Sequence, residues 1–254
     1  MEKKSPPNLS IIVATFNVGG LLKSALDSIT KQDYKDWECV IIDGGSKDCT
    51  LDIIKGYAAK DSRFRYISEP DDGIYDAFNK GWKKAKGEWV YYLGADDELT
   101  KDGFKKIFST QVNEYDIVYG NVIYKVTATK LNYRKTNSLP SLVKRNLQCS
   151  HQGFVMKRSA IKKNSGFNNK DYMICADYDL ILRAYLNASK MIYIDANLAI
   201  FNVCGTSCST VMYKECFLIR KRNKSIGVLN NVSLYIKGIV IFLLRKIKYA
   251  FNKY

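Results

Sequence analysis

The sequence lacks the long apolar segments that mark integral membrane and exported proteins. Its 254 residues contain no apolar run near the roughly 20 residues that a bilayer-spanning helix needs, and the longest run near the C-terminus covers only residues 239–244. The N-terminal stretch MEKKSPPNLS has no apolar core of the kind found in signal peptides. We therefore expect neither a transmembrane helix nor a signal peptide.

The sequence also lacks a recognisable zinc or dinucleotide motif. The seven cysteines are odd in number and scattered, without a CxxC pair, and only one histidine is present. Cys204 and Cys208 could share a helix face, but no second pair completes a zinc set, so we expect reduced thiols in a cytosolic protein. Gly44 and Gly45 belong to no GxGxxG pattern and no Walker lysine follows, which disfavours dinucleotide enzymes and P-loop ATPases.

What the chain does have is a globular composition with an uneven excess of positive charge. It is 46% hydrophobic and 26% charged, with a formal net charge of +15. Residues 211–254 carry ten lysines and arginines against a single acid, Glu215. A basic C-terminal segment on a more balanced body indicates a polyanionic partner, either a membrane surface or a nucleic acid.

Four short apolar segments alternate with segments of helical periodicity in the first part of the chain. The predicted strands cover residues 9–14, 37–43, 63–68 and 88–93, and helices are predicted after each of the first three. Asp48 is the expected N-cap of the second helix. The alternation predicts an α/β fold with a mostly parallel sheet and helices on both faces. Ligands of such sheets bind beyond the carboxyl ends of the strands.

After residue 115 the pattern loosens. Residues 116–133 are predicted to form a hairpin of two strands, residues 177–189 a helix, and residues 191–203 two short strands. From residue 210 the chain is expected to be helical and basic.

Aspartates follow the predicted strands, at the edge where a ligand would bind. They are Asp43, Asp71, Asp72, Asp96 and Asp97. Each alone is most often a turn or N-cap residue. Gathered at one rim, however, unpaired carboxylates repel each other and favour a bound cation. Oxygen ligands suit Mg²⁺ or Mn²⁺, which also bind substrate phosphates.

The ordered motifs SIIVATFN, DGGSKDCT, EPDDGIYDAFNKG, GEWVYYLGADD and ADYDLILR resemble those of the family 2 glycosyltransferases. The resemblance covers about residues 9–210 and implies a GT-A fold, a Rossmann-like mixed sheet flanked by helices. It also implies transfer of a sugar from a nucleotide-sugar with inversion. We expect a catalytic domain over residues 1–210, with a donor-binding half (about 9–115) and an acceptor half (about 116–210), followed by a helical extension over 211–254.

The resemblance also implies roles for particular residues. The implied contacts to the donor nucleotide are Thr15, Asn17, Asp43, Asp72 and Asp96. Asp97 would bind the divalent metal that bridges the diphosphate. The family pattern there is Asp-x-Asp, and this chain has Gly94 at the position of the first aspartate.

A catalytic base and acceptor contacts are implied further along the chain. Asp177 matches the family's base, although Ala176 stands where a glutamate is usual, and the alternative is that Asp177 is a helix N-cap. Such a base contributes about 10²–10⁴-fold to a rate. The family places a His-Gln-Gly-Phe-like segment and a mobile loop near the acceptor and the diphosphate. The implied substrate contacts are His151, Gln152, Gly205 and Ser207.

The C-terminal segment shows the pattern of a basic amphipathic helix over residues 232–251. Its apolar face would comprise Val232, Ile236, Ile239, Val240, Leu243, Leu244, Ile247, Ala250 and Phe251. Such helices bind membrane interfaces, and the basic cluster at residues 220–224 favours this interpretation. The alternative is that the apolar face packs on the catalytic domain or on a second subunit. No nucleic-acid-binding signature is present, and an acidic cleft argues against that partner.

The sequence thus predicts a metal-dependent inverting glycosyltransferase that docks on the inner face of the cell membrane. The expected donor is a nucleoside-diphosphate sugar such as a UDP-sugar, and the expected acceptor is a lipid-linked glycan in bacterial polysaccharide biosynthesis. Two alternatives stay open, a nucleotidyltransferase of similar fold and a non-enzymatic membrane or nucleic-acid adaptor with a degenerate site. The oligomeric state is left open.

Overall fold

The computed structural model describes residues 5–127, 129–202 and 209–251, and for residues 245–251 it describes the backbone alone. One half of its sheet consists of parallel strands in the order β3-β2-β1-β4. Their bounds are Phe64–Ser68 for β3, Trp37–Asp43 for β2, Leu9–Thr15 for β1 and Trp89–Gly94 for β4. These are the four strands that the apolar runs predict.

The other half of the sheet is mixed. Strand β8 (Phe154–Lys157) lies antiparallel to both β4 and β6 (Ile117–Lys125). Next come β9 (Met191–Asn202), parallel to β6, and β5 (Glu98–Leu99), antiparallel to β9, while β7 (Leu131–Arg134) pairs with β6 as the predicted hairpin. The prediction of two short strands in residues 191–203 is wrong, because a single strand absorbs register shifts near Asn121 and remains continuous.

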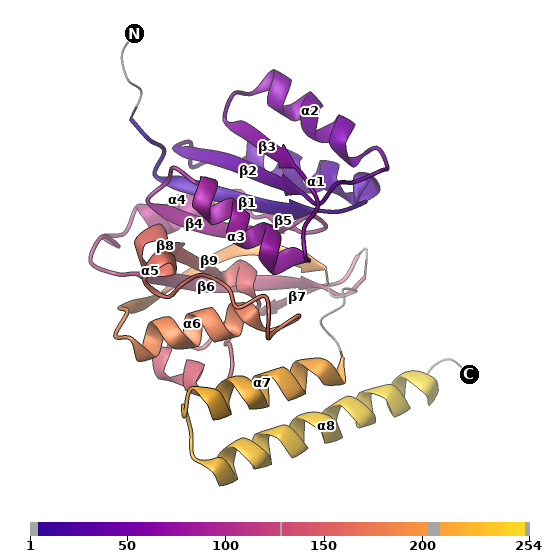
Figure 1. The fold of residues 1–254 in the computed structure, drawn as a ribbon, viewed down its shortest axis with the longest axis vertical. Helices are drawn as coiled ribbons and strands as arrows, with labels where there is room; N and C mark the ends of the chain where they lie inside the picture. The colour runs from indigo at the N-terminus through magenta and orange to yellow at the C-terminus, as the bar shows by residue number, and fades with distance from the viewer. Residues whose placement is uncertain (1–4, 128, 203–208, 252–254) are drawn as a thin grey trace.

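Helices cover both faces of this sheet (Figure 1). They are α1 (Gly19–Thr30), α2 (Thr50–Lys60), α3 (Ile74–Lys84), α4 (Gly103–Phe108), α5 (Arg158–Lys163) and α6 (Ala176–Leu186). Two short 3₁₀ segments, η1 (Pro140–Lys144) and η2 (His151–Gly153), lie between β7 and β8. Cys49, and not Asp48, is the N-cap of α2, and the Asp48 carboxylate instead accepts N–H groups of Gly19 and Thr50.

The core forms because alternate strand residues point to opposite faces of the sheet. In β1, Ile11 and Val13 pack with Leu22 and Leu26 of α1 on one face. On the other face, Ile12 packs in a cluster that includes residues of α3, α5 and α6. The two clusters fix the strands, and with them the polar residues at the strand ends.

The chain ends in a pair of helices, α7 (Thr210–Arg222) and α8 (Val228–Phe251), which lie beyond α6 with α8 outermost (Figure 1). Aromatic contacts join them, with ring centroids 5.4 Å apart for Phe217 and Tyr235 and 6.3 Å apart for Tyr213 and Phe242. Among the described residues, no helix is both long and apolar enough to cross a bilayer.

Part of the basic cluster expected to face a partner is used inside the protein. Arg220 is buried, and its guanidinium donates to the Asn231 side chain and to the Arg145 carbonyl. Arg222 forms an ion pair with Asp171. Lys221 and Lys224 are exposed and remain open to solvent.

Candidate active site

The carboxyl ends of β1, β2 and β4 lie side by side and bring distant polar residues to one edge of the sheet. Thr15 is paired with Asp43, and Ala14 with both Ile42 and Gly94. This edge is where a parallel sheet binds its ligands.

Asp43 is held by the protein itself. It is 0% exposed, and its carboxylate accepts hydrogen bonds from the Thr15 hydroxyl at 3.1 Å, the Ser68 hydroxyl at 2.7 Å, and both the hydroxyl and the N–H of Ser46. Burial alone would raise the pKa of Asp43, but the hydrogen bonds from Ser46, Ser68 and Thr15 outweigh it and keep the pKa below its ordinary value. The structure therefore places Asp43 under the loop that follows β2, with its oxygens already occupied.

The loops around Asp43 carry other predicted residues of the nucleotide site. Asn17 is exposed and has a φ of 50°, and its side-chain oxygen accepts the N–H of Lys47. Asp72 is exposed, whereas Asp71 turns inward and lies beside Gly44, where an added Cβ would meet an Asp71 oxygen at 2.7 Å.

The five aspartates do not form a single acidic cluster. Across the described ranges, no group of three or more His, Cys, Asp or Glu residues is arranged to hold a metal ion. The expected mutual repulsion is avoided at Asp43, because hydroxyl and N–H donors stabilise its charge without a cation. A cation at this edge would have to use few protein ligands, together with phosphate oxygens of a substrate.

The negative charge of Asp97 is stabilised by fewer hydrogen-bond donors than that of Asp43. It is 1% exposed, with one oxygen accepting the Asn202 N–H at 2.9 Å and the other accepting the Gln152 amide. Burial raises the pKa of Asp97 to about 6, and the charge of Asp96 adds to the rise, against the lowering effect of the Asn202 N–H. The Asn202 side chain also donates to the Asp96 carbonyl.

Unpartnered polar atoms lie in the segment that contacts Asp97. In the described part of the chain, the Nε2 atom of His151 and the Oε1 atom of Gln152 are buried without a hydrogen-bond partner. Of these groups, the carboxylate and the amide oxygen are the hard ligands that Mn²⁺ and Mg²⁺ prefer. The Asp97 carboxylate and the Gln152 amide oxygen therefore fit a divalent cation that takes its remaining ligands from substrate phosphates or water.

The geometry also gives a reason for the glycine that departs from the Asp-x-Asp pattern. A Cβ on Gly94 would come within 2.4 Å of an Asp97 carboxylate oxygen. Because that carboxylate is fixed by Gln152 and Asn202, a side chain at position 94 would displace it.

Asp177 lies close to this group. It is the second residue of α6, whose N-cap is Cys175, so the alternative of an N-cap role is wrong. One Asp177 oxygen accepts the Tyr178 N–H at 2.7 Å, and the other lies 3.6 Å from the Nδ1 atom of His151. The side chains of His151 and Asp177 are 19% and 13% exposed. His151 thus connects Asp177 with the segment that contacts Asp97.

Two residues at the site were missed by sequence reasoning, and two others lie outside the described residues. Asn202 was missed because it sits at the end of a strand with no local motif, and Tyr75 because nothing in the local sequence distinguishes it from its neighbours in α3. The Tyr75 hydroxyl donates to the Ile174 carbonyl, three residues before Asp177. The predicted loop residues Gly205 and Ser207 fall in the undescribed range 203–208.

Comparisons with known proteins agree with these observations. Residues 10–188 match the model of the family described as glycosyl transferase family 2. A PGL/p-HBAD biosynthesis glycosyltransferase of Mycobacterium bovis is 34% identical over 217 residues, which is 82% of each chain. A GalNAc(5)-diNAcBac-PP-undecaprenol beta-1,3-glucosyltransferase of Campylobacter jejuni is 34% identical over 119 residues, 46% of this chain and 38% of the relative.

Solved structures share the fold at lower identity. S. aureus TarS 1–349 in complex with UDP-GlcNAc aligns over 91% of this chain and 71% of its own, with a TM-score of 0.66 and 18% identity. The mannosyltransferase PcManGT from Pyrobaculum calidifontis, in complex with GDP-Man and Mn²⁺, aligns over 99% of this chain and 82% of its own, with a TM-score of 0.66 and 15% identity.

Proposed function

The chain belongs to glycosyl transferase family 2, and from this membership we propose that it transfers a sugar, with inversion, from a UDP-sugar to a hydroxyl of a lipid-linked glycan. The observation that carries the proposal is the connected group of Asp97, Gln152, His151 and Asp177 at the carboxyl edge of the sheet. In this group, Asp97 would hold a cation beside the charged leaving group, and Asp177 would accept a proton from the acceptor.

Asp177 is the proposed base. In an inverting transfer, a carboxylate opposite the leaving group takes the proton of the attacking hydroxyl as the new glycosidic bond forms. Asp177 is partly exposed, as this role requires, and one of its oxygens accepts the Tyr178 N–H while the other faces His151. His151, 3.6 Å away, is proposed to orient that oxygen and to contact the acceptor together with Gln152.

The donor nucleotide is proposed to lie over the ends of β1 and β2, in the half of the catalytic domain before residue 116. The exposed Asn17 and Asp72 and the partly exposed Asp96 are the proposed direct contacts. Thr15 and Asp43 are buried and bonded to each other, so we propose that they act through the loop of Ser46 that they hold. The TarS structure in complex with UDP-GlcNAc, which shares the fold, supports the choice of a UDP-sugar.

A divalent metal, Mn²⁺ or Mg²⁺, is proposed to bind at Asp97. When bound, it supplies positive charge beside the diphosphate that leaves. The raised pKa and burial of Asp97 support this role, because a nearby dication would stabilise the ionised form that burial disfavours. The Mn²⁺ in the related mannosyltransferase structure agrees with it.

The acceptor is proposed to be presented at the inner face of the cell membrane, where α8 docks. The α8 face toward α7 contains Tyr235, Gly238 and Phe242. The predicted apolar face is a different one, and its Val232, Ile236, Val240 and Leu243 are between 39% and 56% exposed. This separation favours the lipid surface over packing on the catalytic domain. Sedimentation with anionic but not neutral vesicles would support it.

The decisive test is a nucleotide-sugar screen with purified protein. We expect UDP and Mn²⁺ together to raise the melting temperature, and one UDP-sugar to be consumed with a lipid-linked acceptor. Asp177→Asn should bind the donor normally and lose about 10²–10⁴-fold in transfer rate. Asp52→Asn, at an exposed position of α2, is the matched control and should behave like the wild type. Full transfer by Asp177→Asn would exclude this base, and pyrophosphate release from a nucleoside triphosphate would point to nucleotidyl transfer instead.

A further inference from the structure

A side chain of the C-terminal extension reaches the segment that carries Asp177. Glu215 lies on α7, outside the residues that match the family, and is only 6% exposed. Its carboxylate accepts the backbone N–H groups of Met173 at 2.9 Å, Ile174 at 3.0 Å and Cys175 at 2.8 Å. These residues lead directly into the first turn of α6, which contains Asp177.

We propose that Glu215 is a positioning residue that fixes the location of the Asp177 carboxylate by holding the backbone before α6. The inference rests on the proposed function, since it assigns Glu215 a role through the proposed base. Consecutive N–H groups that converge on one carboxylate adopt a defined backbone path, and hydrogen bonds to an ionised acceptor are stronger than neutral ones. The negative charge also lies next to the N-terminus of α6, where the helix dipole stabilises it.

The same segment is held from its other side by α3. The Tyr75 hydroxyl donates to the Ile174 carbonyl, and the Tyr75 ring stacks on Phe167 with centroids 5.4 Å apart. Ile174 is thus bonded through its N–H to α7 and through its carbonyl to α3. Hydrogen bonds on both sides of Ile174 therefore restrain the backbone just before the first turn of α6.

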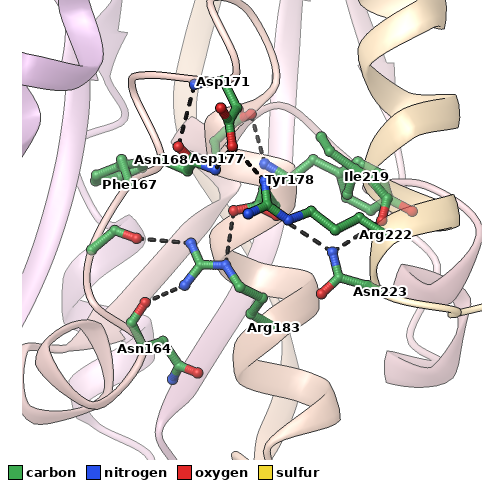
Figure 2. A network of polar contacts seen from close by, with 12 residues as sticks. Asn164, Phe167, Asn168, Asp171, Asp177, Tyr178, Arg183, Ile219, Arg222 and Asn223 are labelled. Atoms are coloured by element: carbon green, nitrogen blue, oxygen red, sulfur yellow. Dashed lines mark hydrogen bonds and ion pairs between the residues drawn. The ribbon is translucent and has the colours of Figure 1, made fainter.

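Further contacts hold α7 in place along α6, as Figure 2 shows. The Asn223 amide donates to Asp179 at 3.4 Å, and Arg222 pairs with Asp171. Asp179, whose side chain is 2% exposed, is in turn bonded to Arg183 at 2.8 Å. The Asn223–Asp179 bond joins the C-terminal end of α7 to α6, and the Arg222–Asp171 pair joins α7 to the loop before α6. These contacts help to hold Glu215 beside the backbone of residues 173–175.

The expected consequence of losing Glu215 is a misplaced base with an intact donor site. Displacement of a reacting group by about 1 Å can lower a rate on the order of 10²-fold. Glu215→Gln is the sharpest change, because the amide keeps the size of the side chain but replaces one acceptor oxygen with a donor that faces N–H groups. It leaves Asp97, Gln152 and the strand ends untouched.

The experiment compares Glu215→Gln with Lys214→Gln, which makes the same amide at an exposed neighbouring position of α7. We expect Glu215→Gln to lower kcat at least about tenfold while the Kd for UDP with Mn²⁺ stays at the wild-type value. Deuterium exchange of the amides of residues 173–175 should be faster in Glu215→Gln and unchanged in Lys214→Gln. If Glu215→Gln does not fold, Glu215→Asp keeps the charge but shortens its reach to the N–H groups of residues 173–175, and it should show the same pattern.

The outcomes separate this inference from the proposed function. A folded Glu215→Gln protein with wild-type kcat and wild-type exchange at residues 173–175 overturns the positioning role. A parallel loss of UDP binding and kcat also overturns it, because that pattern indicates general structural damage. A wild-type protein that transfers no sugar contradicts the proposed function, whereas the amide exchange still reports whether Glu215 holds this segment.

Discussion

Asp43 and Asp97 both follow buried strands at the same edge of the sheet, but the protein treats their charges in opposite ways. Three side chains and one backbone N–H donate to Asp43, whose pKa lies below its ordinary value. Within the described ranges, Asp97 accepts from the Asn202 N–H and the Gln152 amide, and burial raises its pKa to about 6. The difference teaches that position at a strand end does not define a metal site. The proposed metal ligand is instead the carboxylate with fewer protein donors, because a cation would stabilise a charge that burial disfavours.

The largest expected effect follows from removing the charge of Asp97. Asp97→Asn should lower metal-dependent transfer by roughly two to three orders of magnitude, because the metal would lose its principal protein ligand. The metal-free variant should be no less stable than the wild type, since a buried charge has been removed. Steady-state rates against Mn²⁺ concentration and urea unfolding measure the two effects. Wild-type metal activation in the variant would contradict the assignment, and Asp52→Asn again serves as the control.

The sequence predicted the fold, but it did not predict the surroundings of the proposed site residues. Apolar runs at 9–14, 37–43 and 88–93 placed three central strands, because hydrophobic periodicity is local information. The difference between Asp43 and Asp97 could not be predicted from local sequence. It depends on Ser68, which is 25 residues from Asp43 along the chain, and on Gln152, which is 55 residues from Asp97. Glu215 was missed for the same reason, since its acceptor role exists only once α7 is docked on the turn before α6.

The pH dependence of stability provides the next test of the comparison. The Asp97 pKa is raised from 3.8 to about 6 on folding, so the native state binds this proton more tightly than the unfolded state. The contribution of Asp97 is therefore favourable below pH 3.8 and is lost as pH rises through 6, a change of roughly 2–3 kcal/mol in the free energy of unfolding. Urea unfolding of metal-free protein should show this fall between about pH 4 and 6 in the wild type and not in Asp97→Asn. An identical dependence of stability on pH in both proteins would contradict a raised pKa of Asp97 in the folded state.

The smallest expected effect concerns Asp43. Asp43→Asn should reduce the free energy of unfolding by about 1–2 kcal/mol, because the amide cannot accept from all the donors that surround the carboxylate. The new NH₂ group would be a second donor facing donors such as the Ser46 N–H. Unlike Asp97→Asn, it should leave the dependence of activity on Mn²⁺ concentration unchanged. Asp72→Asn, exposed at the same edge, is the control and should not change stability. Because the Asp43 pKa is lowered on folding, its stabilising effect is present above pH 3.8 and is lost as pH falls further, opposite in sign to Asp97. A stable Asp43→Asn protein with weakened metal activation would reverse the two assignments and make Asp43 the residue that the cation needs.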